Sequence, residues 1–154
     1  PNLVQIKAPN YGEVGAGTVV PFAPRRESVT VLVPRALAGD DEIGTITVNG
    51  ESLSDHGIQS GDILLFRTNG TNRDVTPETV CVVRIVSTGE MLAKKIVRRT
   101  KGTGMLALRS SGGGIPDRFI HEDDIEVLGI VFGFQRMADK NGRFPLATGE
   151  DVPL

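Results

Sequence analysis

Thr47-Val48-Asn49-Gly50-Glu51-Ser52-Leu53 is the stretch that decides how this chain folds, together with the turn Gly57-Ile58-Gln59-Ser60-Gly61-Asp62 that follows it. A run rich in β-branched residues ends at Gly50, and the chain re-enters an apolar run at Ile63. Ser52 lies on the bend between the two runs, and the polar residues after it are enough for one helical turn. Free backbone amides at such a bend can support a nucleophilic serine, but an ordinary turn serine is equally typical of this position.

The length and composition predict one globular domain. The chain has 154 residues, of which 39% are hydrophobic and 23% charged, a composition that is typical of a folded protein. No apolar run approaches the ~20 residues of a transmembrane helix, and the N-terminal residues lack a signal-peptide core. With a formal charge of -2, nothing in the composition suggests a strongly basic surface for nucleic acid. We therefore expect a cytoplasmic protein without a membrane segment.

The residue types that bind metals and phosphates are sparse. The single cysteine, Cys81, excludes an internal disulfide and a cysteine-based metal site, and its apolar neighbours predict a buried, inert thiol. The run 121–124 holds a histidine and three acidic residues, but neighbours on a loop rarely converge on one ion, so solvated charge is expected there. Gly112-Gly113-Gly114 lacks the Lys-Ser/Thr of a phosphate loop. The sequence predicts no metal and no cofactor.

Short apolar runs rich in valine and isoleucine alternate with turn signals along most of the chain. Nineteen glycines and nine prolines break it into pieces that are too short for long amphipathic helices. The predicted strands are 29–33, 43–48, 63–66, 80–86, 91–97, 105–108 and 125–134. Strands of this length, separated by Gly, Asn and Asp turns at roughly 8–12-residue spacing, predict a mostly β sandwich or barrel.

The runs 79–86 and 91–97, joined by Ser87-Thr88-Gly89-Glu90, predict a β-hairpin. Alternation along the second strand puts Lys94 and Lys95 on opposite faces, each between apolar residues, so that one of the two lysines should face inward. A desolvated lysine has a lowered pKa and can act as a neutral base. The alternative is that both lysines extend to water at a sheet edge.

Ser52 needs a base if it is to act as a nucleophile, and two residues are candidates. His56, four residues later, would share a face with Ser52 on a helical turn, or is a solvated turn residue. Lys94 is the second candidate, because Ser-Lys dyads are a known variant of the serine nucleophile arrangement. The backbone amides of Glu51 and Ser52 would supply the oxyanion hole. From the residues alone, both bases remain open.

Three separated blocks in a fixed order carry a resemblance to a known family. They are residues 11–17, the stretch around Ser52 with its following turn, and residues 90–96, which contain Lys94. The chain resembles the S24 peptidases, which comprise LexA-type repressors, phage CI-type repressors and UmuD subunits of mutagenic polymerases. Leu53 replaces the methionine that the family more often has after the serine, and residues 125–133 resemble its closing strand. The similarity covers about residues 11–134.

The resemblance implies a single compact β domain of the LexA and signal-peptidase type, built of short, strongly bent antiparallel sheets. It implies that Ser52 attacks the chain's own Ala16-Gly17 bond with Lys94 as general base and acid, which leaves His56 as a bystander. The expected organisation is an N-terminal arm with the cleavage segment at 1–22, a catalytic and dimerisation domain at 23–137, and a tail at 138–154. Because the lysine must be neutral, cleavage should accelerate as the pH rises.

The resemblance also implies partners. In relatives, the RecA–single-stranded DNA filament promotes cleavage after DNA damage, and the strand Ile125–Phe134 contributes to a homodimer. Only 16 residues precede the proposed bond. We therefore expect either the C-terminal half of a repressor that contacts DNA through a missing N-terminal domain, or a complete UmuD-like polymerase subunit. The residues after Phe134 favour the repressor. A non-catalytic dimerisation module is a third reading, against which the joint presence of Ser52, Lys94 and Ala16-Gly17 argues.

Overall fold

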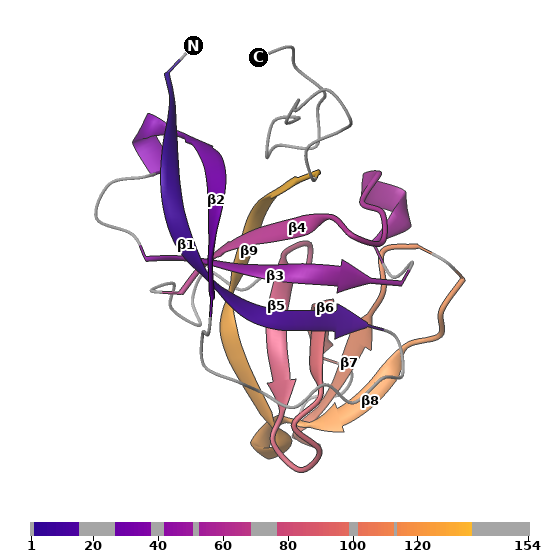
Figure 1. The fold of residues 1–154 in the computed structure, drawn as a ribbon. Helices are drawn as coiled ribbons and strands as arrows, with labels where there is room; N and C mark the ends of the chain where they lie inside the picture. Colours follow the sequence, from indigo (N-terminus) through magenta and orange to yellow (C-terminus); the bar gives the residue numbers. More distant parts are fainter. Residues whose placement is uncertain are drawn as a thin grey trace.

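The computed structural model describes residues 2–15, 27–37, 42–50, 53–68, 77–98, 102–112 and 114–136 (Figure 1). Within these ranges, the regular structure consists of strands and three-residue 3-10 turns. The strands are β1 (Leu3–Gly15), β2 (Glu27–Pro34), β3 (Ile43–Asn49), β4 (Ile63–Arg67), β5 (Val80–Ile85), β6 (Met91–Arg98), β7 (Met105–Arg109), β8 (Arg118–His121) and β9 (Ile125–Gln135). The turns are η1 (Arg35–Leu37), η2 (Ser54–His56) and η4 (Glu122–Asp124). The mostly β fold is confirmed.

The nine strands form one sheet in the order β2-β1-β3-β4-β9-β5-β6-β7-β8. Every neighbouring pair is antiparallel except β1 and β3, which run parallel. The last strand, β9, lies between β4 and β5, and its register shifts on both sides, once against each neighbour. Such irregularities bend a sheet. The expected compact domain of bent strands is therefore confirmed, with a parallel pair that we did not expect.

Two strands were missed by the sequence reading. β1 lies in the segment expected to be an N-terminal arm, and Pro9 and Gly12 interrupt its apolar pattern. β8 has only four residues, which alternate between polar and apolar side chains. Both strands are defined by their partners more than by their own composition, because β1 pairs along two edges and β8 extends the edge of β7.

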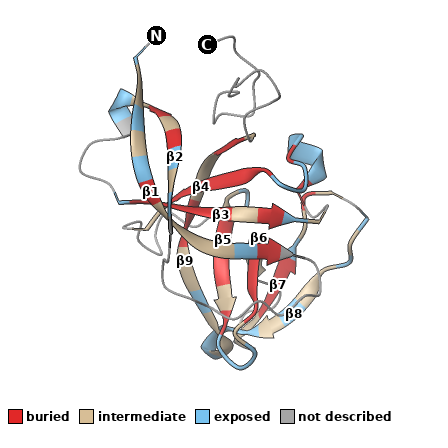
Figure 2. Cartoon of the chain, viewed as in Figure 1, coloured by how far each residue is buried: buried red, intermediate tan, exposed pale blue. Residues whose placement is uncertain are grey.

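The strands β3, β4, β5 and β6 carry runs of successive buried residues, as Figure 2 shows. The central residues of β4 and β5 read as continuous apolar runs, and a strand covered on both faces needs apolar residues at successive positions. Three hydrophobic clusters fill the interior. The first cluster, which bears on function, contains Val14, Ile46, Val48, Leu53, Ile58, Leu64, Phe66, Val82, Met91, Ala93 and Phe134.

The predicted hairpin is confirmed. β5 and β6 pair antiparallel, and Cys81 lies directly opposite Lys94. Gly89 adopts a φ of 75° in the connecting turn, a conformation that glycine reaches without steric cost. The Cys81 thiol is fully buried, as expected, and burial raises its pKa to about 11. It is therefore a protonated, unreactive group on the same face as Lys94.

Candidate active site

Lys94 lies in the interior of β6, and its side chain is only 5% exposed. Its face of the strand also carries Leu92 and Ile96, which pack in the same hydrophobic cluster as Cys81. Lys95 points the other way and remains half-buried, with its Nζ 3.9 Å from Glu78 Oε2. The prediction that one of the two lysines faces inward is confirmed, and the inward one is Lys94.

The surroundings of Lys94 favour its neutral form. Burial lowers the pKa of the Lys94 amine, and the nearby Arg118 guanidinium lowers it further, while Glu90 partly opposes both by raising it. Glu90 is itself buried and is held by Arg118, whose Nη1 lies 2.6 Å from Glu90 Oε1. Because this ion pair carries almost no net charge, burial remains the dominant effect on the lysine. The Lys94 Nζ donates a hydrogen bond to Ser110 Oγ.

The predicted nucleophile, Ser52, and the amide of Glu51 lie outside the described residues, but the chain on either side is well anchored. Gly50 follows the end of β3 with a φ of 121°. Leu53 is fully buried in the first cluster, and η2 follows it as the single helical turn that the sequence predicts. The nearest described residues on the two sides of Ser52 are therefore a residue at a strand end, Gly50, and a core residue, Leu53.

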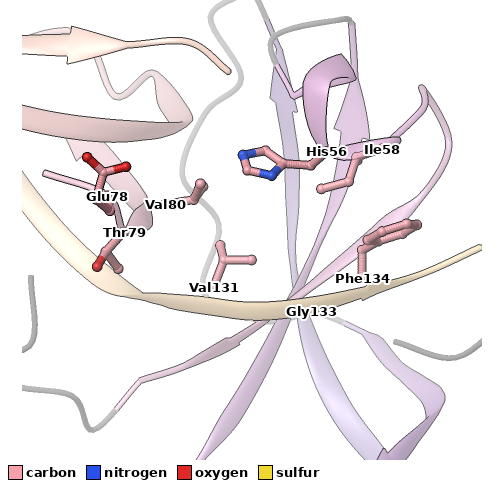
Figure 3. Close-up of a pocket in the computed structure, with 8 residues that line it drawn as sticks. All are labelled: His56, Ile58, Glu78, Thr79, Val80, Val131, Gly133 and Phe134. Carbon is pink, nitrogen blue, oxygen red and sulfur yellow. The ribbon is translucent and has the colours of Figure 1, made fainter. Parts of the chain in front are cut away.

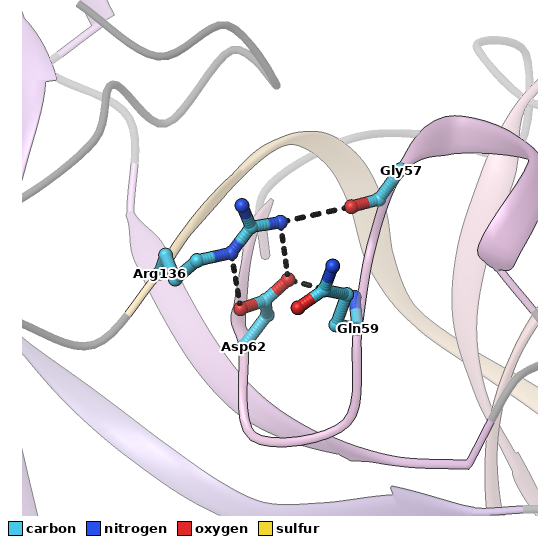
Figure 4. A network of polar contacts seen from close by, with 4 residues as sticks. All are labelled: Gly57, Gln59, Asp62 and Arg136. Atoms are coloured by element: carbon cyan, nitrogen blue, oxygen red, sulfur yellow. Dashed lines mark hydrogen bonds and ion pairs between the residues drawn. The ribbon is translucent and has the colours of Figure 1, made fainter. Parts of the chain in front are cut away.

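The turn at 57–62 is tied to the end of β9 by a buried carboxylate (Figure 4). Asp62 is 2% exposed and accepts hydrogen bonds from the Gln59 amide at 2.7 Å and from Arg136 Nε at 3.2 Å. Arg136 Nη2 also donates to the Gly57 carbonyl at 2.9 Å. The sequence alone predicts no role for Asp62 and gives no indication of Arg136. The sequence signal for such a partner was the position of Asp62 just before the apolar strand β4, because a carboxylate that is buried there requires a hydrogen-bonding or cationic partner.

A loop after β7, residues Ser110, Ser111 and Gly112, contacts the turn that follows Ser52. The Asp55 amide donates to the Ser111 carbonyl at 2.7 Å. The same loop provides the Ser110 hydroxyl that accepts from Lys94. From sequence this loop was only a turn signal, since nothing local connects it with a lysine 16 residues away.

The proposed cleavage bond, Ala16-Gly17, also lies outside the described residues, but the strand leading to it is described. β1 and β3 run in the same direction, and Gly15 is opposite Asn49 (Figure 1). The chain therefore leaves β1 just before Ala16, at the same end of the sheet where it leaves β3 just before the bend with Ser52.

Comparisons with known proteins agree with this geometry. The family model of S24-like peptidases matches residues 9–132. The chain belongs to the S24-like peptidase family. The LexA repressors of Paramagnetospirillum magneticum and Novosphingobium aromaticivorans are each 30% identical to it over 131 residues, which are 85% of this chain and 52% of each repressor. The LexA repressor of Gluconobacter oxydans is 27% identical over 124 residues, or 80% of this chain and 49% of that protein. The chain thus spans about half the length of these relatives.

In this S24-like domain, His56 is exposed at the end of η2 and lines a cavity of about 380 Å³ (Figure 3). The lining residues are His56, Ile58, Glu78, Thr79, Val80, Val131, Gly133 and Phe134. Lys94 is not among them. Lys94 therefore has the buried, desolvated setting that a neutral lysine requires, whereas His56 is exposed and lies outside that setting.

The remaining motifs of the S24-like domain show structural roles. His121 Nδ1 accepts from the Asp123 amide at 3.1 Å, which caps η4. Among the residues that the structure describes, no three His, Cys, Asp or Glu side chains come together as metal ligands. Within the same residues, no helix has the length and apolar character needed to cross a membrane.

Proposed function

We propose that this domain is a serine peptidase that cleaves its own chain between Ala16 and Gly17, with Ser52 as nucleophile and Lys94 as general base. The observation that carries the proposal is the burial of the Lys94 amine in a site that lowers its pKa. Only a neutral amine can accept the serine proton, and a lowered pKa makes Lys94 neutral at a lower pH than an ordinary lysine. A buried lysine between Leu92 and Ile96 on one face of β6 is unusual, because a charged amine loses its hydration there.

The reaction follows from these roles. Lys94 Nζ takes the Ser52 hydroxyl proton as the oxygen attacks the Ala16 carbonyl, and the amides of Glu51 and Ser52 hold the oxyanion. Each such donor is worth ~3 kcal/mol of transition-state stabilisation. Lys94 then gives its proton to the leaving Gly17 amine, which leaves Ala16 as an ester on Ser52. Water, deprotonated by Lys94, hydrolyses the ester and restores the serine.

The parallel pairing of β1 with β3 supports the choice of bond. It directs the chain beyond Gly15 and the chain beyond Asn49 toward the same end of the sheet. Carrying substrate and nucleophile on one chain makes the reaction intramolecular, which removes much of its entropic barrier. The small residues Gly15, Ala16 and Gly17 suit a bond that must lie close to a sheet edge. Control would then lie in how often this segment occupies the site.

We propose further that the domain belongs to a LexA-type repressor whose self-cleavage follows DNA damage, because the relatives described above are LexA repressors. The RecA–single-stranded DNA filament would promote the cleavage, and an additional N-terminal domain would contact DNA. A homodimer would use β9. Since both edges of β9 are paired within the sheet, a second copy would contact its side chains rather than its backbone. A UmuD-like polymerase subunit, activated by the same cleavage, is the alternative role.

The test is a mass measurement over time on the purified protein at mildly alkaline pH, with and without RecA filament. Loss of the first 16 residues is expected. The variants Ser52→Ala and Lys94→Ala should remain intact, whereas His56→Ala should be cleaved at the wild-type rate. An unchanged wild-type mass even with the filament would reject self-cleavage and favour a non-catalytic dimerisation module. Cleavage that survives in Lys94→Ala but not in His56→Ala would identify the histidine as the base.

The two biological roles are separated by the native gene. A helix-turn-helix domain encoded in frame upstream identifies a repressor, because that motif places a helix in the major groove of an operator. A gene that starts at this chain identifies the polymerase subunit instead.

A further inference from the structure

We infer that residues Ser110, Ser111 and Gly112, here called the 110–112 loop, form a positioning element that sets Lys94 and the Ser52 turn at a fixed separation. In this role the Ser110 hydroxyl orients the Lys94 amine, and the Ser111 backbone holds the turn after Ser52. The inference rests on the proposed self-cleavage and adds to it a third group of residues outside the serine and lysine blocks.

The contact between Ser110 and Lys94 is set by the sheet. β6 and β7 pair antiparallel with Lys95 opposite Arg109, so the residue after β7 comes opposite Lys94. Lysine has a long, flexible side chain, and a buried amine points toward whichever partner accepts its hydrogen bond. Ser110 Oγ is the acceptor that the structure gives to Lys94 Nζ. The hydroxyl can therefore select the lysine conformer from which the amine serves Ser52.

The other end of the loop is held against η2. The Asp55 amide donates to the Ser111 carbonyl at 2.7 Å, so the backbone three residues beyond Ser52 is fixed to the loop. Gly112 adopts a φ of 147°, and a Cβ there would lie 2.7 Å from the Asp55 amide nitrogen and closer still to Ser54 Oγ. Only glycine permits both this backbone conformation and this approach.

The loop thus contacts the proposed base and the turn η2, which follows Ser52, through neighbouring residues. Ser110 meets the lysine and Ser111 meets the turn that begins just after Ser52. One peptide link separates the two contacts, so the distance between base and nucleophile turn cannot change without breaking one of them. A misplacement of about 1 Å between reacting groups can cost roughly 100-fold in rate.

The first experiment removes the hydroxyl. Ser110→Ala should slow self-cleavage by roughly 10- to 100-fold at the alkaline plateau, and Ser110→Thr, which restores a hydroxyl, should recover most of the rate. Ser87→Ala is the matched control, because it deletes a serine hydroxyl that bonds Asp124 in the turn between β5 and β6. The second readout is the ¹³Cε NMR resonance of Lys94, which should shift in Ser110→Ala and stay in place in Ser87→Ala.

The second experiment tests the close approach of the loop. Gly112→Ala should slow cleavage strongly, because its Cβ would displace the loop from η2. Gly114→Ala is the control, since Gly114 also has a positive φ, of 61°, but a Cβ there meets nothing within 4 Å. Thermal unfolding of both variants separates backbone strain, which they share, from displacement of the loop, which only Gly112→Ala causes.

The outcomes separate this inference from the proposed function. Wild-type protein that cleaves itself, with Ser110→Ala and Gly112→Ala cleaving equally fast, would overturn the positioning role and leave self-cleavage intact. Wild-type protein that never cleaves would overturn self-cleavage. In that case the Lys94 resonance would still test the contact between Ser110 and Lys94. An unchanged resonance in Ser110→Ala would overturn the positioning role as well.

Discussion

A single buried amine is the residue on which the proposed chemistry of this domain depends. Lys94 faces a cluster of apolar side chains, with Cys81 opposite it on β5, Arg118 on β8 and Glu90 just before β6 as the charged groups that act on it. The cationic form loses its hydration in such a place, so the neutral form is favoured. A lysine in water is cationic at neutral pH, whereas burial here shifts the equilibrium toward the neutral amine. The charges of Arg118 and Glu90 then lower and raise the Lys94 pKa, respectively.

The pH dependence of self-cleavage should report this balance. Only neutral Lys94 is a base, so the rate should rise with pH through a midpoint below that of a free lysine. Glu90→Gln removes the group that raises the Lys94 pKa, so the midpoint should move to lower pH. Arg118→Gln removes a group that lowers this pKa, so the midpoint should move to higher pH. The measurement is the cleavage rate of each variant across the pH range, and midpoints that move in the same direction would contradict the assignment.

At the scale of elements, the site is assembled from strand ends and turns rather than from one motif. β1 and β3 run parallel, so their ends at Gly15 and Asn49 lie at one end of the sheet. β6 carries the proposed base, Lys94, and β7 ends at the loop that contacts it. The end of β9 fixes the turn after η2 through Arg136. Each turn is exposed to solvent on one side, so its geometry depends on a few buried anchors.

The end of β1 is one of these anchors. Val14 is 3% exposed and packs in the same cluster as Leu53. Val14→Ala should lower the free energy of unfolding by roughly 1–3 kcal/mol and also slow cleavage several-fold, since the segment leading to Ala16 loses contacts with the core.

The matched control for this change is Val33→Ala. Val33 is equally buried but pairs with Val4, near the start of β1 and far along the strand from Gly15. In urea unfolding, Val33→Ala should lose about as much stability as Val14→Ala. Under conditions where both variants are folded, Val33→Ala should cleave at the wild-type rate. Equal cleavage rates in the two variants would show that docking of the β1 end does not limit the reaction.

The buried carboxylate of Asp62 is a second anchor. Arg136→Ala should lower the free energy of unfolding by roughly 2–3 kcal/mol, because it leaves Asp62 buried with the Gln59 amide but without its cation. Arg109→Ala breaks an ion pair of similar length, 2.9 Å to Asp117, at the surface, and should cost much less because water screens that pair. Chemical denaturation of both variants gives the comparison, and equal losses would refute a structural role for the Asp62 network.

At the scale of the whole molecule, the sheet is completed by its last strand. β9 pairs with β4 on one side and β5 on the other, so it joins the half that carries β1 and β3 to the half that carries β6 and β7. The proposed nucleophile turn and the proposed base lie in different halves. The active site can therefore form only after β9 has been added, which makes folding and activity depend on the same long-range pairing.

Truncation tests this dependence. A chain ending after residue 137 keeps all nine strands, the three clusters and Arg136, and should unfold at the same temperature as the full chain and cleave at the same rate. A chain ending at Asp124 lacks β9 and should show no cooperative unfolding transition. Circular dichroism during heating measures both. A large destabilisation of the longer fragment would show that residues 138–154 belong to the folded domain.

Much of this architecture follows from local patterns in the chain. Apolar runs bounded by turn residues predict seven of the nine strands, and the 87–90 turn predicts the hairpin. Alternation alone indicates that Lys94 or Lys95 faces inward. These features depend on a few neighbouring residues, because strand periodicity and turn chemistry act over short distances.

The contacts that build the site depend instead on which strands pair and in what register. β1 was not recognised because its own pattern is broken, and it is held by β2 and β3. Nothing local connects Ser110 with Lys94, or Arg136 with Asp62, which is 74 residues away. The physical reason is that register is chosen by burying three hydrophobic clusters at once, and a shift of one residue would turn every side chain to the opposite face. Local sequence thus produced the strand of Lys94 and the turn η2, and the packed sheet decided that one loop contacts both.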